Sequence, residues 1–367
     1  MESWYDKLKD QTFSTTFLHL AIEEVQVLTA VIERFTCLAH PVAETEPHLP
    51  IRRGPISTEE VQQFLSNATT DLPELGSLLR RIDESLQRFS KNGAFFKCSQ
   101  RSPKDVILSW KSGVHPKVIN FLEAKGYAIH SLTEEQLASE HFYKTMVLAL
   151  MQLLRVHNST EVMWLLLCSE RTTTDVNAHA ALLPNEKKGI SHEAFELLPR
   201  LAFCFREWNE EMLEHPAFEF RAFVCNNSLN ALTQYATDQY SSELNESKDE
   251  VAERILNFFN NYCKGPLSQI GSYVIDFYAP PKCAASYPQV LVVELNTFSS
   301  YAGGSLFKWS SDYSVFKNGP FEFRIVTQPV EYSANDIPKG YLQALKKKTW
   351  YEQLKSSFHL LVASLSA

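Results

Sequence analysis

The sequence predicts an α+β protein. Segments with two-residue alternation, which is typical of strands, occur beside segments with apolar residues at helical spacing. They do not follow a regular strand–helix–strand rhythm, and no repeat period runs along the 367 residues. That length is enough for two lobes and a sizeable core. We therefore expect an α+β fold rather than a doubly wound parallel sheet.

Composition and charge exclude several classes of protein. With 44% hydrophobic and 21% charged residues, the chain has the balance of a globular protein. A net charge of −8 argues against general nucleic-acid or anionic-membrane binding. The apolar runs at 146–154 and 162–168 are too short for a membrane span, and the N-terminus lacks a signal-peptide core. Seven cysteines without a CxxC pair indicate a reducing compartment, so we expect a cytoplasmic protein.

The N-terminal half is predicted to combine short strands with several helices. Residues 12–20 (TFSTTFLHL) favour a strand, and the proline-rich residues 40–55 favour a linker. Ser57 and Glu60 have the spacing of a capping box at the start of a helix. Further expected elements are a helix at about 75–89, a strand at 94–97, helices at 117–125 and 134–155, a strand or helix end at 162–168 and an exposed loop at 172–192.

The C-terminal half is predicted to hold most of the strands. They are expected at 201–205, 219–224, 231–235, 273–278 and 290–298, with a helix at 251–259 and a closing helix in the last thirty or so residues. We expect an N-terminal lobe at 1–200 that includes a helical segment at about 113–190, a C-terminal lobe at 201–330 and a helical tail at 331–367.

Two of these strands carry candidate metal ligands. In YVIDFY, alternation puts Asp276 on the face opposite Ile275, and in VLVVELNTF it puts Val290, Val292, Glu294 and Asn296 on one face. If the strands pair, two carboxylates and an amide oxygen converge, and these hard ligands suit Mg²⁺ beside the phosphates of a nucleotide. The alternative is a solvated sheet face on which both acids meet water.

Other charged residues on strands complete the candidate set. In PAFEFRAFV, Glu219 and Arg221 share a face, where they can pair with each other or hold a ribose hydroxyl and a phosphate. Lys97 can extend into water or reach a phosphate, and Lys104 can be turn polarity or a phosphate ligand. Together these residues supply the parts of a Mg·ATP site without a Gly-rich loop, since the sequence holds no GxxxxGK, GxGxxG, HExxH or GxSxG.

The order of motifs resembles the cell division cycle protein 123 (D123) family, a branch of the ATP-grasp fold. The segments that carry the resemblance are SWYDKLKDQTFSTTFLHL, LLRRIDESLQRF, FFKCSQRSPKDV, REWNEEMLEHPAFEFRAFV, LNALTQY, YVIDFY, VELNTF, GGSLFKW and FEFRIV. They lie in the right order over most of residues 3–326. The resemblance implies an ATP-grasp-like protein of two lobes with ATP and magnesium between them.

The resemblance also implies roles for individual residues. Lys97, Arg206, Trp208, Glu219 and Arg221 match segments that contact the nucleotide. Asp276, Glu294 and Asn296 match the metal ligands. Lys104 follows the Lys97 strand and is a further candidate for the nucleotide.

The family's role is that of an ATP-binding assembly chaperone for eukaryotic translation initiation factor 2, acting on its gamma subunit. The alternative is an ATP-grasp ligase or kinase that acts on an unknown acceptor. The chain departs from the family pattern at Glu294, at Thr297, at 98–101, at Tyr235–Ala236 and over about 113–190. At Glu294 a carboxylate ligand is retained in place of the family's Asp, so we expect the ATP site to be largely kept and the client surfaces to be changed.

Overall fold

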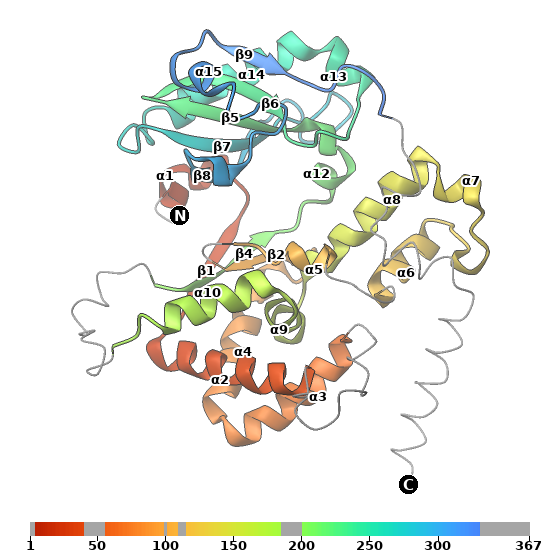
Figure 1. Ribbon diagram of the computed structural model, residues 1–367, viewed down its shortest axis with the longest axis vertical. Helices are drawn as coiled ribbons and strands as arrows, with labels where there is room; N and C mark the ends of the chain where they lie inside the picture. Colours follow the sequence, from red (N-terminus) through yellow and green to blue (C-terminus); the bar gives the residue numbers. More distant parts are fainter. Residues whose placement is uncertain (1–3, 40–55, 99–100, 109–114, 185–199, 331–367) are drawn as a thin grey trace. The chain divides into compact units, whose positions relative to one another are not determined.

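The computed structural model describes residues 4–39, 56–98, 101–108, 115–184 and 200–330. The chain forms two units, whose elements are labelled in Figure 1. Among the described residues, unit 1 holds 4–15 with 206–330, and unit 2 holds the described part of 16–205. Residues 4–15 therefore belong with the C-terminal unit, whereas the sequence placed them in the N-terminal lobe. Helices accompany both described sheets, which confirms the predicted α+β class.

Unit 1 is built on a five-stranded sheet with the order β8-β7-β5-β6-β9. Its strands are β5 (Glu219–Cys225), β6 (Ser228–Gln234), β7 (Tyr273–Tyr278), β8 (Leu291–Thr297) and β9 (Glu322–Arg324). β5 pairs antiparallel with both β6 and β7, β7 pairs antiparallel with β8, and β6 pairs parallel with β9. Four of these strands were predicted, and the three-residue β9 was not.

The two faces of this sheet are covered differently. On one face, Phe220 and Ala222 of β5 join a large core that includes Ile255 of α14 (Lys248–Phe258) and Leu8 of α1 (Tyr5–Leu8). On the other face, Phe223 joins a smaller cluster with Phe316 of α15 (Tyr313–Asn318). Each fully buried side chain of this kind contributes about 1.5–3 kcal/mol. The alternation predicted for PAFEFRAFV is therefore confirmed.

The remaining elements of unit 1 are short and connect the strands. They are η2 (Lys9–Gln11), α12 (Glu210–Glu214), η7 (Pro216–Phe218), α13 (Ser242–Glu246), the π-helical turn η8 (Phe259–Cys263) and η9 (Ser300–Ala302).

The second sheet has the order β1-β4-β2-β3, and the division between the units falls within β1 and β4. Its strands are β1 (Thr15–His19), β2 (Ala94–Cys98), β3 (Arg155–Val156) and β4 (Ala202–Glu207). The first helices of unit 2 are α2 (Ile22–Ala39), α3 (Thr58–Asp71), α4 (Pro73–Leu86) and the single turn η3 (Gln87–Phe89). The predicted capping box of Ser57 and Glu60 is formed at the start of α3. α2 was not predicted, although its buried residues have helical spacing.

The segment at about 113–190 departs from the prediction in two places. Its described elements are α6 (Pro116–Ala124), η4 (Ile129–Ser131), α7 (Glu134–Leu137), α8 (Glu140–Met151), η5 (Gln152–Leu154), β3, α9 (Ser159–Cys168) and α10 (Glu170–Ala180). The helix expected at 134–155 is broken because the Ser139 hydroxyl accepts from the Phe142 amide and starts α8 anew. The loop expected at 172–192 was wrong as far as Ala180. Ser169 caps α10, and Thr172 and Val176 are buried.

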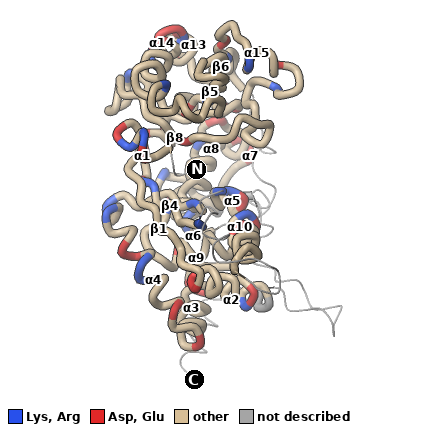
Figure 2. Tube along the Cα trace, turned by 90° about the vertical axis from the view of Figure 1, so that its left-hand side faces the viewer, with Lys and Arg blue, Asp and Glu red and all other residues tan. Residues whose placement is uncertain are grey.

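Several expectations cannot be compared with the structure in the same way. The linker at 40–55, the closing helix and residues 185–192 of the expected loop lie outside the described residues. The short helix α5 (Asp105–Leu108), which was not predicted, is described. Basic and acidic residues are interspersed along the described trace of each unit (Figure 2). None of the helices in the described ranges combines the length and apolarity that a membrane crossing requires.

Candidate functional site

Three neighbouring strands of unit 1 bring the predicted charged residues together. Arg221 of β5 lies opposite Asp276 of β7, and Asp276 lies opposite Glu294 of β8. Side chains at directly paired positions project from the same face of a sheet. Asn296 lies two residues beyond Glu294, opposite Val274 of the same face. We call Arg221, Asp276, Glu294 and Asn296 the charge row.

The centre of the charge row is a buried ion pair. Arg221 donates from Nε to Oδ1 of Asp276 and from Nη2 to Oδ2, both at 2.8 Å. The two residues are 6% and 1% exposed, so Asp276 does not lie on a solvated sheet face, which was the alternative reading of this strand. Burial alone would lower the pKa of Arg221. The hydrogen bonds and charge of Asp276 outweigh that effect and raise the pKa above its ordinary value.

The other two residues of the charge row, Glu294 and Asn296, lie on β8 and are half-buried. The Nδ2 amide of Asn296 donates to Oε1 of Glu294 at 3.1 Å and to Oδ2 of Asp276 at 3.4 Å. The two carboxylates and the amide therefore meet in one place, as the alternation of β7 required. Among the described residues, no group of three or more His, Cys, Asp or Glu side chains is placed to hold a metal ion. The predicted ligand set consists of two carboxylates and one amide, so only two of its three members are residues of those types.

A β-bulge places Glu294 and corrects one predicted face. The register passes from Asp276 opposite Glu294 to Phe277 opposite Val292, which leaves Val293 without a partner in the ladder. Val290 and Val292 consequently lie in the large core rather than on the face of Glu294, where strict alternation had put them. The carbonyl of Val293 accepts a hydrogen bond from Nη1 of Arg206.

Two residues that the sequence did not nominate surround the Arg221 guanidinium. Its carbon lies 4.7 Å from the centre of the Tyr235 ring, and its Nη1 donates to the carbonyl of Gly303 at 3.4 Å. Gly303 has φ +70°, and a Cβ there would lie 3.3 Å from Nη1. The GGSLFKW motif could have signalled Gly303. Nothing local to Tyr235 indicated its role, because its position beneath Arg221 depends on the pairing of β5 with β6.

The other predicted nucleotide contacts of unit 1 have structural partners. Arg206 also donates from Nε to Thr15 Oγ1 at 3.3 Å and lies over the Trp4 ring. The buried Trp208 donates from Nε1 to Glu210 Oε2 at 2.8 Å. Glu219 starts β5 on the face of Arg221 and lies opposite Tyr278. The contacts of Arg206 with Thr15 and Trp4 attach this segment to the N-terminal residues of the same unit.

The two predicted lysines lie in unit 2. Lys97 is a half-buried residue of β2, and Lys104 is exposed just before α5. Arg101, three residues before Lys104, donates from Nε and Nη2 to Oδ1 of Asp175 at 2.9 and 2.5 Å. Asp105 accepts from the Ser169 hydroxyl at 2.6 Å. Arg101 and Asp105, which flank Lys104, are therefore attached to α10 and to its N-cap, and the contact of the lysines with a nucleotide stays a prediction.

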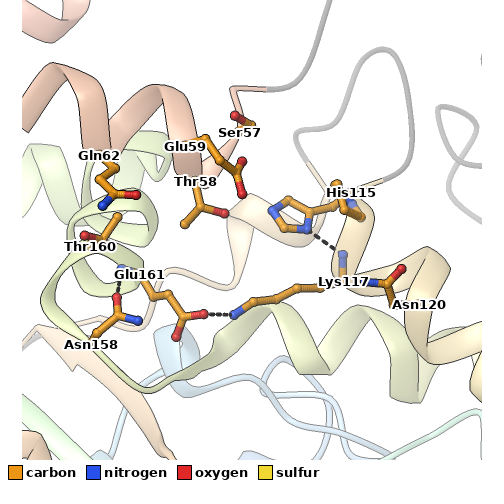
Figure 3. A pocket seen from close by; sticks show the side chains of 11 residues that line it. Ser57, Thr58, Glu59, Gln62, His115, Lys117, Asn120, Asn158, Thr160 and Glu161 are labelled. Atoms are coloured by element: carbon orange, nitrogen blue, oxygen red, sulfur yellow. Dashed lines mark hydrogen bonds and ion pairs between the residues drawn. The ribbon is translucent and has the colours of Figure 1, made fainter. Parts of the chain in front are cut away.

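Unit 2 also contains a pocket of about 450 Å³ that the sequence did not indicate (Figure 3). The N-termini of α3, α6 and α9 open into it, capped by Ser57, His115 and Asn158. Within it, Lys117 Nζ lies 2.5 Å from Glu161 Oε1. Side-chain caps occupy the three helix N-termini and Lys117 is paired with Glu161, so the pocket does not favour a particular ligand.

Comparison with known proteins identifies the family. A translation initiation factor eIF2 assembly protein of Candida albicans is 24% identical over 193 residues, which cover 50% of this chain and 51% of the relative. The chain thus matches about half the length of that relative. Cdc123 from Schizosaccharomyces pombe is 17% identical with a TM-score of 0.48, and its C-terminally truncated form is 17% identical with a TM-score of 0.49. Both alignments cover 89% of this chain and 94% of the other. The profile of the D123 family matches residues 145–345, more than half of the chain, and the chain belongs to that family.

Proposed function

We propose that this D123 protein binds Mg·ATP at the charge row and, in that state, acts as an assembly chaperone for translation initiation factor eIF2 with the gamma subunit as its client. The observation that carries the nucleotide site is the meeting of Arg221, Asp276, Glu294 and Asn296 on one sheet face. The client is suggested by family membership and by the eIF2 assembly protein of Candida albicans.

The donor chemistry of the charge row fits magnesium. Mg²⁺ is usually held by one or two carboxylates together with phosphate oxygens and water. Asp276 and Glu294 would supply the carboxylates, and Asn296 would supply its amide oxygen after rotation of the side chain. When bound, the metal would neutralise negative charge on the phosphates. The 3.1 Å and 3.4 Å contacts among these three residues keep their oxygens within reach of one ion.

The basic residues of the proposal have separate tasks. Arg221 is buried at the charge row and offers a planar fork of donors that suits a phosphate. Lys97 and Lys104 of unit 2 would add point charges to the phosphates. Glu219 would accept from a ribose hydroxyl, and Arg206 with Trp208 would border the base. Such a set binds and orients the nucleotide of an ATP-grasp-like protein without requiring that ATP be hydrolysed.

The same groups would also serve a ligase or kinase of the ATP-grasp class. Phosphoryl transfer depends mainly on positioning and on neutralisation of phosphate charge, which a lysine, an arginine and a metal supply. The two functions differ in turnover. Release of ADP that depends on an added acceptor would favour the enzyme, and binding of ATP with little turnover favours the chaperone.

A retention experiment with purified eIF2 subunits tests the chaperone proposal. Each subunit is immobilised separately, and the full chain is applied with or without Mg·ATP. We expect the gamma subunit to retain the wild type with Mg·ATP and to retain Asn296→Ala much less, while Asn67→Ala on the exposed face of α3 behaves as wild type. Equal retention of wild type and Asn296→Ala, or no retention by the gamma subunit, would overturn the proposal.

A further inference from the structure

The Asp276 carboxylate accepts three hydrogen bonds from within the protein. Each carboxylate oxygen faces a nitrogen of Arg221 at 2.8 Å, and Oδ2 also receives the Asn296 amide at 3.4 Å. The carboxylate is 1% exposed, so these donors take the place of water. A divalent cation needs a lone pair on one of these oxygens and is repelled by a guanidinium beside it. Arg221 therefore competes with a metal ion for Asp276 in this arrangement, through its charge and through the lone pairs that its two hydrogen bonds occupy.

The surroundings of Arg221 show which ligand could release it. Besides Asp276, the structure gives the Arg221 guanidinium two further contacts. They are the centre of the Tyr235 ring at 4.7 Å and the Gly303 carbonyl at 3.4 Å. Neither carries a full charge. The charge of Glu294 also acts on Arg221, but Glu294 is itself a proposed metal ligand. A phosphate group accepts the same two parallel hydrogen bonds as Asp276 does. With Glu294 engaged by the metal, a ligand of that kind would leave the arginine compensated after it parts from Asp276.

We propose that Arg221 occupies the metal position at Asp276 until a polyphosphate draws it away, so that a divalent cation binds tightly only together with the nucleotide. This inference rests on the proposed function for its nucleotide, but the competition between Arg221 and the metal is a property of the chain alone. By linkage, the factor by which nucleotide tightens metal binding equals the factor by which metal tightens nucleotide binding. Tyr235 and Gly303 are positioning residues in this exchange, since they hold Arg221 over Asp276.

Manganese titration of the full chain tests the competition. The probe is Mn²⁺ alone, followed by calorimetry or by the spin resonance of the free ion. Arg221→Lys keeps the positive charge but loses the fork that engages both oxygens. We expect it to bind Mn²⁺ about tenfold more tightly than the wild type, within the usual range of such couplings. The matched control is Arg324→Lys, because Arg324 lies in the same cross-strand row and makes the same two-pronged contact with Asp312 at 3.0 and 3.1 Å.

The outcomes separate this inference from the proposed function. Unchanged Mn²⁺ affinity in a folded Arg221→Lys, or an equal gain in Arg324→Lys, would overturn the competition. If Arg221→Lys does not fold, Tyr235→Leu takes its place, because it retains the ion pair but removes the ring that supports Arg221. We expect Tyr235→Leu to give a smaller gain in Mn²⁺ affinity, and no gain would overturn the inference.

In the wild type, a non-hydrolysable ATP analogue should tighten Mn²⁺ binding. Failure to bind the analogue at all would overturn the proposed nucleotide site, while the comparison made with Mn²⁺ alone would still decide the competition.

Discussion

The hydroxyl of Thr12 donates a hydrogen bond to the carbonyl of Val292 at 2.6 Å, across 280 residues of sequence. The same two residues form an isolated parallel bridge beside β8. Trp4 and Phe13 belong to the large core of unit 1. The N-terminal residues therefore cover the outer edge of β8, the strand that carries Glu294 and Asn296, and an edge strand gains stability when its backbone groups are paired.

Replacing Trp4 should destabilise unit 1 although the residue is close to the chain terminus. Trp4 is 6% exposed, and its ring packs beneath Arg206. We expect Trp4→Ala to lower the free energy of unfolding by about 3–5 kcal/mol, the range for large aromatic residues in cores. Urea unfolding followed by circular dichroism measures the change. Tyr301→Ala, at a side chain that is 98% exposed, is the control and should change stability by less than about 0.5 kcal/mol.

The buried ion pair makes a second prediction about stability. Arg221→Leu leaves Asp276 buried without its counter-ion, and the loss of one partner from such a pair costs about 3–5 kcal/mol. Arg34→Leu removes the partner of Asp71, whose side chain is 66% exposed, and should cost less than about 1 kcal/mol. Denaturant unfolding of both variants gives the comparison. Similar losses in the two would mean that the Arg221–Asp276 pair is not isolated from water.

Part of this arrangement could be read from the sequence because strands alternate. Phe220 and Arg221 were assigned to opposite faces of β5, and the structure has them there. The same rule failed at Val292, because a bulge depends on how β7 and β8 pair and leaves no mark in the alternation of either strand. Tyr235 was noted only as a departure from the family pattern. Its contact with Arg221 was not predicted, since only the pairing of β5 with β6 brings its ring beneath Arg221.

The helices show the limit of polarity as a guide. The sequence of α10 is polar and was expected to be a loop, yet Thr172 and Asp175 are buried because each has a hydrogen-bond partner in the fold. Those partners lie in α9 and in the turn after β2, which no local pattern reveals. By contrast, the Ser57–Glu60 capping box is local in both sequence and structure, and it was found correctly.

Substitution of the metal ligands on β8 should abolish stabilisation by Mg·ATP. A ligand at one hundred times its Kd stabilises the native state by about 2.7 kcal/mol, which raises the melting temperature of the wild type. Glu294→Gln and Asn296→Ala should each lose that rise while the nucleotide-free protein stays folded, because both side chains are only half-buried. Differential scanning fluorimetry with and without Mg·ATP measures it. A normal rise in both variants would contradict the proposed site.

Gly304 should not tolerate a side chain. A Cβ at this position would lie 2.2 Å from the carbonyl oxygen of Phe307, within the turn that carries the Gly303 contact to Arg221. We expect Gly304→Ala to destabilise the protein by about 1–3 kcal/mol, as overpacking does. Gly265→Ala is the matched control, since nothing lies within 4 Å of a Cβ there. Equal denaturant midpoints for the two variants would show that the turn adjusts without loss.

His115 should make the stability of unit 2 depend on pH. Its side chain is 3% exposed, and its Nδ1 accepts from the backbone amide of Lys117 at 3.0 Å, which caps α6 with the neutral ring. Burial, together with the nearby charge of Lys117, lowers the pKa of His115 to about 3. In the unfolded chain the pKa is about 6.5, so the unfolded state takes up the proton first as the pH falls.

The stability that neutral His115 provides is therefore complete above about pH 6.5 and is lost as the pH falls from there toward 3, at about 1.4 kcal/mol per pH unit. Between about pH 7 and about pH 4.5 this residue should account for a loss of about 3 kcal/mol. His115→Asn keeps an acceptor at the cap but has no proton to gain in that window. Because all other groups titrate alike in the two proteins, the wild type should lose more stability than the variant over this interval in urea unfolding. Parallel pH profiles would mean that the unfolded and folded chains protonate His115 equally, and that the cap tolerates a charged ring.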